Sequence, residues 1–191
     1  MKFPDKYLTL KDNIFKKNEY SIVPIRYKDR NDIMRWRNEQ IYHLRQTIPL
    51  THDDQEHYFK IVVSKLFDQK HPDQILFSFL KNDKCIGYGG LVHISWIDRN
   101  AEISFIMDTR LEKNEFQLNW KIFLELIEKV AFDQLNLYKL YTYAFDLRPQ
   151  LYSVLESVGY NKEAVLKSHC FFEKKFINVV IHSKFNYENS I

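Results

Sequence analysis

The sequence has few glycines, prolines and cysteines for a chain of 191 residues, with 4, 5 and 2 of them respectively. So little glycine and proline excludes collagen-like and low-complexity chains. The two cysteines, Cys85 and Cys170, form no CxxC pair, which argues against a cysteine-based metal site and excludes a disulfide-dense scaffold. We expect both thiols to be reduced and buried, with one disulfide between them as the alternative.

Long apolar runs and a strong charge of either sign are also missing. No stretch approaches the roughly 18 apolar residues of a membrane-spanning helix, so we expect no membrane partner. The first residues, MKFPDKYLTLKDN, have no apolar segment of the kind found in signal peptides. The net charge is only +3 and acids alternate with bases, which argues against nucleic acid as a partner. We therefore predict a cytoplasmic protein.

Apolar and aromatic side chains are abundant, at 45% and 16% of the chain. This composition and length suit one globular domain with a substantial core. We expect a polar lead-in at residues 1–19, a single domain at 20–186 and a short tail at 187–191.

Alternating and helical patterns give the order of elements. Thr51 and the acids after it begin one helix, and Asn114 with Gln117 forms a capping-box pattern that begins another. The predicted helices are 29–38, 51–67, 115–134 and 149–158. The predicted strands are 20–27, 74–80, 85–94, 101–107, 138–145, 161–170 and 176–185. This order predicts an α/β fold with a mixed, mostly antiparallel central sheet and helices on both faces.

Four short motifs are spread along this pattern. They are Cys85–Gly90 (CIGYGG), Ala101–Phe105 (AEISF), Gly159–Tyr160 followed by Glu163, and the strand Phe176–Ser183. Together with the element order they resemble the GNAT superfamily of N-acetyltransferases over almost the whole chain, from about residue 20 to residue 185. The tripeptide Trp36–Asn38 (WRN) is similar to bacterial members that acetylate nucleotide-linked amino sugars, and ribosomal-protein acetyltransferases share part of it.

The resemblance implies acetyl-CoA as co-substrate. Where the family has a glycine-containing loop for the CoA diphosphate, this chain has Arg110–Trp120 (RLEKNEFQLNW), which contains no glycine. A helix N-terminus still attracts anions without glycine, and Glu112 and Glu115 oppose that attraction. The residues expected to contact CoA are Ile106, Met107, Arg110, Lys113, Asn114, Phe116 and Arg148.

Acetyl transfer to an amine needs a base, because only the neutral amine is nucleophilic. Glu102 occupies the family's usual acid–base position, and burial in a sheet would raise the pKa of its carboxyl group. The alternative is an ordinary strand-end glutamate paired with Arg99. His43, in the connection between the first two helices, is a second candidate for base or substrate contact. The family's usual tyrosine position holds another residue here, so Tyr152 is the candidate general acid, with packing as the alternative.

Aromatic faces and an arginine suit a sugar or nucleotide acceptor. The candidate substrate-binding residues are Trp36, Arg37, Tyr88, Trp96 and His93. No histidine has metal-ligand spacing with a cysteine or an acid pair, so we expect no metal.

The predicted function is acetyl-CoA-dependent N-acetylation of a small-molecule primary amine, with a nucleotide-linked amino sugar for surface polysaccharide as the preferred acceptor. A protein N-terminus is the second candidate. A GNAT-fold binding module that has lost CoA affinity is the alternative from another class. The fold also allows a homodimer.

Overall fold

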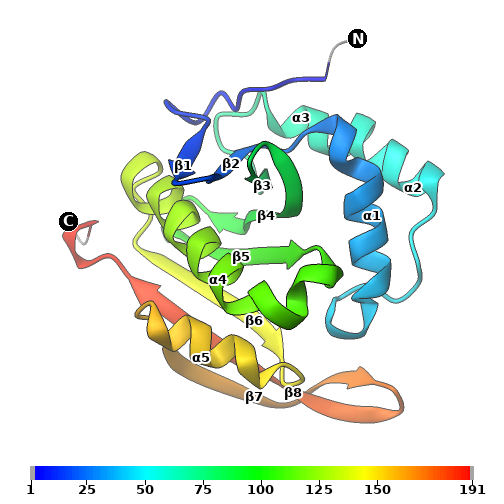
Figure 1. Cartoon of the computed structure of the whole chain (residues 1–191). Coiled ribbons are helices and arrows are strands. Elements are labelled where there is room, and N and C mark those ends of the chain that lie inside the picture. Colours follow the sequence, from blue (N-terminus) through cyan, green and yellow to red (C-terminus); the bar gives the residue numbers. More distant parts are fainter. Residues whose placement is uncertain (1–2, 190–191) are drawn as a thin grey trace.

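A computed structural model describes residues 3–189, which form one eight-stranded sheet with the strand order β1-β2-β3-β4-β5-β6-β8-β7 (Figure 1). The strands are β1 (Phe15–Lys17), β2 (Tyr20–Pro24), β3 (Ile75–Lys81), β4 (Lys84–Ser95), β5 (Asn100–Met107), β6 (Lys139–Phe145), β7 (Asn161–Phe172) and β8 (Lys175–Phe185). The helices are α1 (Arg30–Glu39), α2 (His52–His57), α3 (Ser64–Leu66), α4 (Thr109–Glu128) and α5 (Pro149–Ser157). π-Helical turns at Tyr58–Val63 and Lys129–Gln134 extend α2 and α4.

Helices lie on both faces of the sheet, as the sequence predicts. On one face, Phe123 of α4 stacks on Phe105 of β5 with ring centroids 4.0 Å apart. The opposite face is covered by α1 and α2, whose residues share a cavity wall with Tyr88 and Ser104. The predicted mixed α/β fold is therefore confirmed, with β5 and β6 forming its parallel pair.

The residues expected to be a surface lead-in belong instead to the core. Tyr7 is fully buried and its hydroxyl donates to the carbonyl of Leu76 at 2.9 Å, and Leu10 and Phe15 are also buried. β1 pairs with β2 through Phe15, which extends the sheet by one edge strand. The lysines make this segment polar overall, so its buried apolar residues were not expected in the core.

Helix α4 begins at Thr109, several residues earlier than the Asn114 capping box predicts. The N-cap is Asp108, whose side chain accepts a hydrogen bond from the backbone N–H of Arg110. Asn114 is exposed within the helix, so its predicted capping role is wrong. The stretch predicted to be a loop is therefore the first turns of α4, and this changes where the helix presents its amides.

The parallel pairing of β5 with β6 is short and leaves an opening in the sheet. The two strands pair only from Asn100–Lys139 to Glu102–Tyr141. On the other side, β4 stays closely paired with β5, and a Cβ atom at Gly89 would collide with the carbonyl oxygen of Ser104. The glycines of β4 thus allow one side of β5 to be tightly paired while its other side separates from β6.

No helix in the described part of the chain is long and apolar enough to cross a bilayer.

Candidate active site

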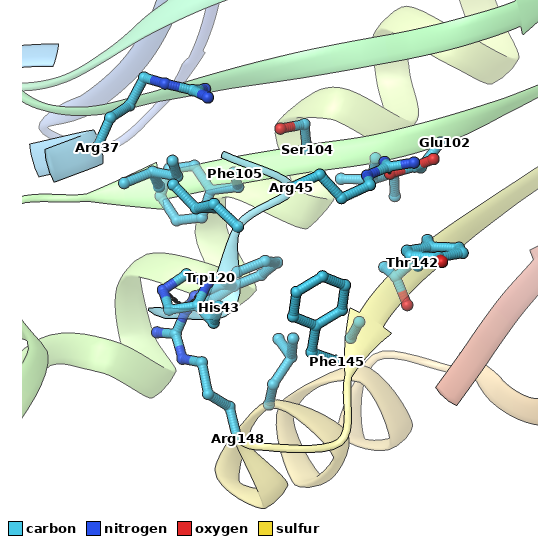
Figure 2. Close-up of a pocket in the computed structure, with 16 residues that line it drawn as sticks. Arg37, His43, Arg45, Glu102, Ser104, Phe105, Trp120, Thr142, Phe145 and Arg148 are labelled. Carbon is cyan, nitrogen blue, oxygen red and sulfur yellow. Dashed lines mark hydrogen bonds and ion pairs between the residues drawn. The ribbon is translucent and has the colours of Figure 1, made fainter. Parts of the chain in front are cut away.

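A cavity of about 210 Å³ lies where β5 and β6 separate (Figure 2). Its walls come from both strands, from α1, α4 and α5, and from the connection between α1 and α2. The lining residues include Arg37, His43, Arg45, Glu102, Ser104, Trp120, Thr142, Tyr143, Phe145 and Arg148. Unpaired strand edges and a mixed polar and apolar wall suit a ligand that contains amides.

Glu102 lies at the closed end of this opening, at the last position where β5 still pairs with β6. It is 5% exposed, and burial raises the pKa of its carboxyl group, while Arg45 and then His93 oppose the rise. One carboxylate oxygen forms an ion pair with Arg45, and the other lies 3.9 Å from Nε2 of His93. Arg99, the partner expected from the sequence, donates to the backbone carbonyl of Asn136.

Arg45 reaches Glu102 from the connection between α1 and α2 (Figure 2). Its guanidinium also lies over the ring of Tyr143 on β6, 4.5 Å from the ring centroid. Sequence patterns do not indicate this residue, because 57 positions separate it from Glu102.

His43 lines the cavity, but its ring is engaged by Arg148. The guanidinium of Arg148 lies 2.8 Å from Nε2 of His43, and since arginine can only donate, Nε2 accepts. Burial, and then the charge of Arg148, lowers the pKa of His43 to about 3. His43 is therefore neutral with its Nε2 lone pair occupied, and it cannot accept a proton at that atom while the contact persists.

Arg148 connects three elements around the cavity. It is the N-cap residue of α5 and is 6% exposed, and its guanidinium donates to Glu112 in the first turn of α4 at 2.6 Å. The same group lies 5.0 Å from the ring centroid of Phe116. Its Nε has no hydrogen-bond partner among residues 3–189. The charge of this buried arginine is balanced mainly by Glu112.

The expected CoA-binding residues divide between the cavity and the start of α4. Ile106 lines the cavity, while Met107 is buried and its carbonyl accepts from the side chain of Gln40 at 2.9 Å. Arg110 is exposed and pairs with Asp108 at 2.9 Å through its Nε. Lys113 and Asn114 face solvent.

The cavity and the start of α4 are the places expected for the two ends of acetyl-CoA, and they differ in how well they suit them. The cavity between β5 and β6 suits the acyl and pantetheine end, which is narrow and contains amides. The N-terminus of α4, where the family would place the diphosphate, already holds the carboxylate of Asp108, with Glu112 one turn further on. Cations near the same end, Arg110 and Lys113, would have to bind the diphosphate in place of free backbone amides.

Two of the five candidate substrate-binding residues lie outside the cavity. Trp36 is 1% exposed and belongs to the core, and its indole N–H has no partner within residues 3–189. Trp96 donates its indole N–H to the carbonyl of Pro72 at 2.9 Å and packs edge-on against His71. The structure therefore does not bring these tryptophans to the cavity, although aromatic faces suit sugar binding and Trp36 is part of the WRN tripeptide.

Of the other three candidates, Arg37 and His93 lie at the cavity or beside Glu102, and Tyr88 contacts Arg37. Arg37 lines the cavity and donates to the hydroxyl of Tyr88 at 2.6 Å. His93 is exposed beside the Glu102 carboxylate, at an irregular position of β4 with a positive φ of 51°.

Tyr152 does not reach the cavity. Its hydroxyl donates to Asp146 at 2.9 Å and its ring stacks on His182 with centroids 5.0 Å apart. Thr142, which the sequence did not indicate, is 3% exposed and lines the cavity, with a hydroxyl that has no partner in the described part of the chain. Neither its residue type nor its spacing distinguishes Thr142 from other strand threonines.

The described residues contain no cluster of three or more His, Cys, Asp or Glu side chains that could hold a metal ion.

Comparisons with known proteins agree with this fold. Residues 22–181 match the family described as the acetyltransferase (GNAT) domain. No protein of curated function has a sequence similar enough to match.

Solved structures with the same fold include two acetyltransferases from Vibrio species. The spermidine N-acetyltransferase from Vibrio cholerae, in complex with CoA and spermine, superposes with a TM-score of 0.79 at 16% identity, covering 92% of this chain and 100% of that one. The ribosomal-protein-S5-alanine acetyltransferase from Vibrio fischeri gives 0.73 at 16% identity, covering 93% of this chain and 98% of that one. The match to the family covers most of the sequence, and the chain therefore belongs to the GNAT family of acetyltransferases.

Proposed function

We propose that Glu102 is the general base of an acetyl transfer from acetyl-CoA to a primary amine. Membership of the GNAT family makes the chain an N-acetyltransferase with acetyl-CoA as its co-substrate. The observation that carries the role of Glu102 is its position, buried at the closed end of the cavity between β5 and β6.

Acetyl-CoA supplies an activated acyl group, and the protein must supply a neutral amine beside it. Burial keeps the pKa of Glu102 above that of an ordinary glutamate, which makes its carboxylate a better proton acceptor near neutral pH. The oxygen that faces His93 is the one not paired with Arg45, so it is the oxygen placed to take the proton, directly or through a water molecule. Tyr152 has no part in this proposal, because its hydroxyl donates to Asp146 away from the cavity.

The acceptor proposed first is a nucleotide-linked amino sugar. It is supported by the WRN tripeptide and by the position of Arg37, whose guanidinium lies in the cavity wall. A protein N-terminus is the second candidate, supported by the shared fold of the ribosomal-protein-S5-alanine acetyltransferase. Acetylation assays with one substrate of each kind would rank the two candidates directly.

The role of Glu102 is tested with Glu102→Gln, which keeps the size of the side chain and removes the proton acceptor. We expect kcat/KM for the amine to fall by roughly 10²- to 10⁴-fold, the usual contribution of a general base. Acetyl-CoA affinity, measured by calorimetry, should stay unchanged. As a matched control, Glu163→Gln removes a carboxylate from β7 that pairs with Lys139. Undiminished turnover in Glu102→Gln would exclude this residue as the base.

A further inference from the structure

A second cavity, of about 280 Å³, lies on the α1–α2 face of the sheet. Six of its lining side chains are apolar, and the others are polar groups from α1, from α2 and the turn that extends it, from the residue before β3, and from β4 and β5. Arg37 and Ser104 line this cavity and also the cavity beside Glu102, so the two spaces meet at these residues.

Strand register places the second cavity on the same side of the sheet as the proposed base. In the antiparallel β4–β5 pair, Val92 is opposite Glu102 and Gly90 is opposite Ser104, and opposite residues share a face. Ser104 is two residues from Glu102, a separation of about 7 Å along the strand. An amine held at Glu102 can therefore belong to a molecule whose body fills the second cavity.

Among residues 3–189, Arg37 has no carboxylate partner, unlike most arginines of the protein. Six arginines of the described chain form ion pairs with Asp or Glu: Arg26, Arg30, Arg35, Arg45, Arg110 and Arg148. Arg37 donates instead to the neutral groups of Gln46, at 3.0 Å, and Tyr88, at 2.6 Å. A guanidinium has five N–H donors, so several remain for a ligand.

A half-buried guanidinium without a counter-ion is costly unless an anion binds to it. Three guanidinium groups line the two cavities, but Arg45 pairs with Glu102 and Arg148 pairs with Glu112. Within residues 3–189, Arg37 is therefore the one guanidinium of this lining that has no carboxylate partner. This balance disfavours a polyamine, because a second ammonium group would meet arginine. It favours an acceptor that has one amine for Glu102 and a negatively charged group for Arg37.

We propose that the second cavity binds the body of the acceptor and that Arg37 binds a phosphate group on it. The acceptor is therefore an amine that also carries a phosphate ester, and the rest of the molecule lies against the apolar wall of the second cavity. Arg37 is a specificity residue rather than a participant in proton transfer. The position of the amine in this inference rests on the proposed role of Glu102, and the phosphate site at Arg37 does not.

Binding measured without acetyl-CoA tests the proposal independently of turnover. Calorimetry compares three probes on the wild-type protein: glucosamine 6-phosphate, glucosamine and spermidine. We expect the phosphorylated sugar to bind at least about tenfold more tightly than glucosamine, the effect of one charge-assisted hydrogen-bonding group. The proposal would be overturned by equal affinity for the two sugars or by tighter binding of spermidine. It would also be overturned if the phosphorylated sugar did not bind at a concentration of about 10 mM.

The variant Arg37→Met should lose the preference for phosphate while its affinity for glucosamine stays the same. Arg35→Met is the matched control, since this exposed arginine of the same helix pairs with Asp32 and should not affect the binding of either sugar.

Val92→Phe, which reduces the volume of the second cavity and leaves Arg37 in place, should weaken the binding of both sugars. A tenfold preference that persists in Arg37→Met would place the phosphate elsewhere. If Arg37→Met fails to fold, the comparison of the three probes on the wild type still decides.

Discussion

At the scale of single residues, Glu102 combines two opposing influences on one carboxyl group. Burial disfavours its charged form, and the guanidinium of Arg45 favours it. Arg45 thus limits how far the pKa of the proposed base can rise. A base held in this way is a stronger proton acceptor than an exposed glutamate.

The acid limb of kcat/KM against pH should report this balance. The base must be deprotonated, so activity should rise with pH through a limb that lies above the ordinary glutamate pKa of about 4.3. In Arg45→Met the cation that opposes the rise is gone, and the limb should move to higher pH. A limb that stays in place or moves to lower pH would contradict the pairing of Arg45 with the catalytic base. Arg35→Met serves again as the control.

His43 should make folding stability depend on pH. The unfolded chain protonates this histidine below about pH 6.5, whereas the folded protein keeps it neutral until its lowered pKa of about 3. Protonation therefore favours the unfolded state between these values, and stability present above pH 6.5 is lost as the pH falls. Thermal unfolding should show that Tm falls less steeply between pH 6.5 and 4 in His43→Gln than in the wild type. The same substitution at the exposed His52 should leave the slope unchanged, and an unchanged slope in His43→Gln would contradict the buried contact with Arg148.

At the scale of elements, the start of α4 is where we expect the diphosphate end of CoA to bind. Asp108 satisfies a backbone amide that a phosphate could otherwise use, and it adds a negative charge at the positive end of the helix. The absence of glycine in Arg110–Trp120 is explained by the structure, because these residues are helical and contain no loop.

Asp108→Asn should increase acetyl-CoA affinity about two- to fivefold, since it removes a charge near the helix end. Asparagine is as good an N-cap as aspartate, so Tm should remain close to that of the wild type. Calorimetry with acetyl-CoA measures the affinity, and Glu125→Gln, near the other end of α4, is the control. Weaker binding in Asp108→Asn would show that the carboxylate helps to position the co-substrate.

The sequence was informative where structure depends on neighbouring residues. The alternating run 101–107 gave β5 and the position of Glu102, and Thr51 gave the start of α2. The start of α4 was misplaced because the Asn114–Gln117 pattern satisfies the same local rules as a true cap, and only the tertiary structure shows that Asp108 caps the helix. Trp36 was assigned to a ligand because nothing local distinguishes a buried tryptophan from an exposed one.

At the scale of the whole molecule, the site is assembled from groups far apart in the sequence. Arg148 meets His43 across 105 positions, and Arg45 meets Glu102 across 57. Such pairs depend on the sheet order and on where β5 and β6 separate, and no spacing in the sequence records them. The second cavity was unpredictable for the same reason, since five elements contribute to its wall.

The separation of β5 from β6 is the feature on which the whole account depends. It provides the cavity, it places Glu102 at the closed end, and it leaves strand edges for an amide-containing ligand. If acetyl-CoA occupies this opening, a bulky side chain inside it should exclude the co-substrate without disturbing the charged groups.

Calorimetric titration of acetyl-CoA tests this central claim most directly, with the wild type compared with Ala144→Trp, which fills the cavity from β6. We predict saturable binding to the wild type with a Kd below about 1 mM, and a loss of at least about tenfold in the folded variant. Absence of binding to the wild type at millimolar acetyl-CoA would contradict the account and would favour a GNAT-fold module that binds its partners without the co-substrate.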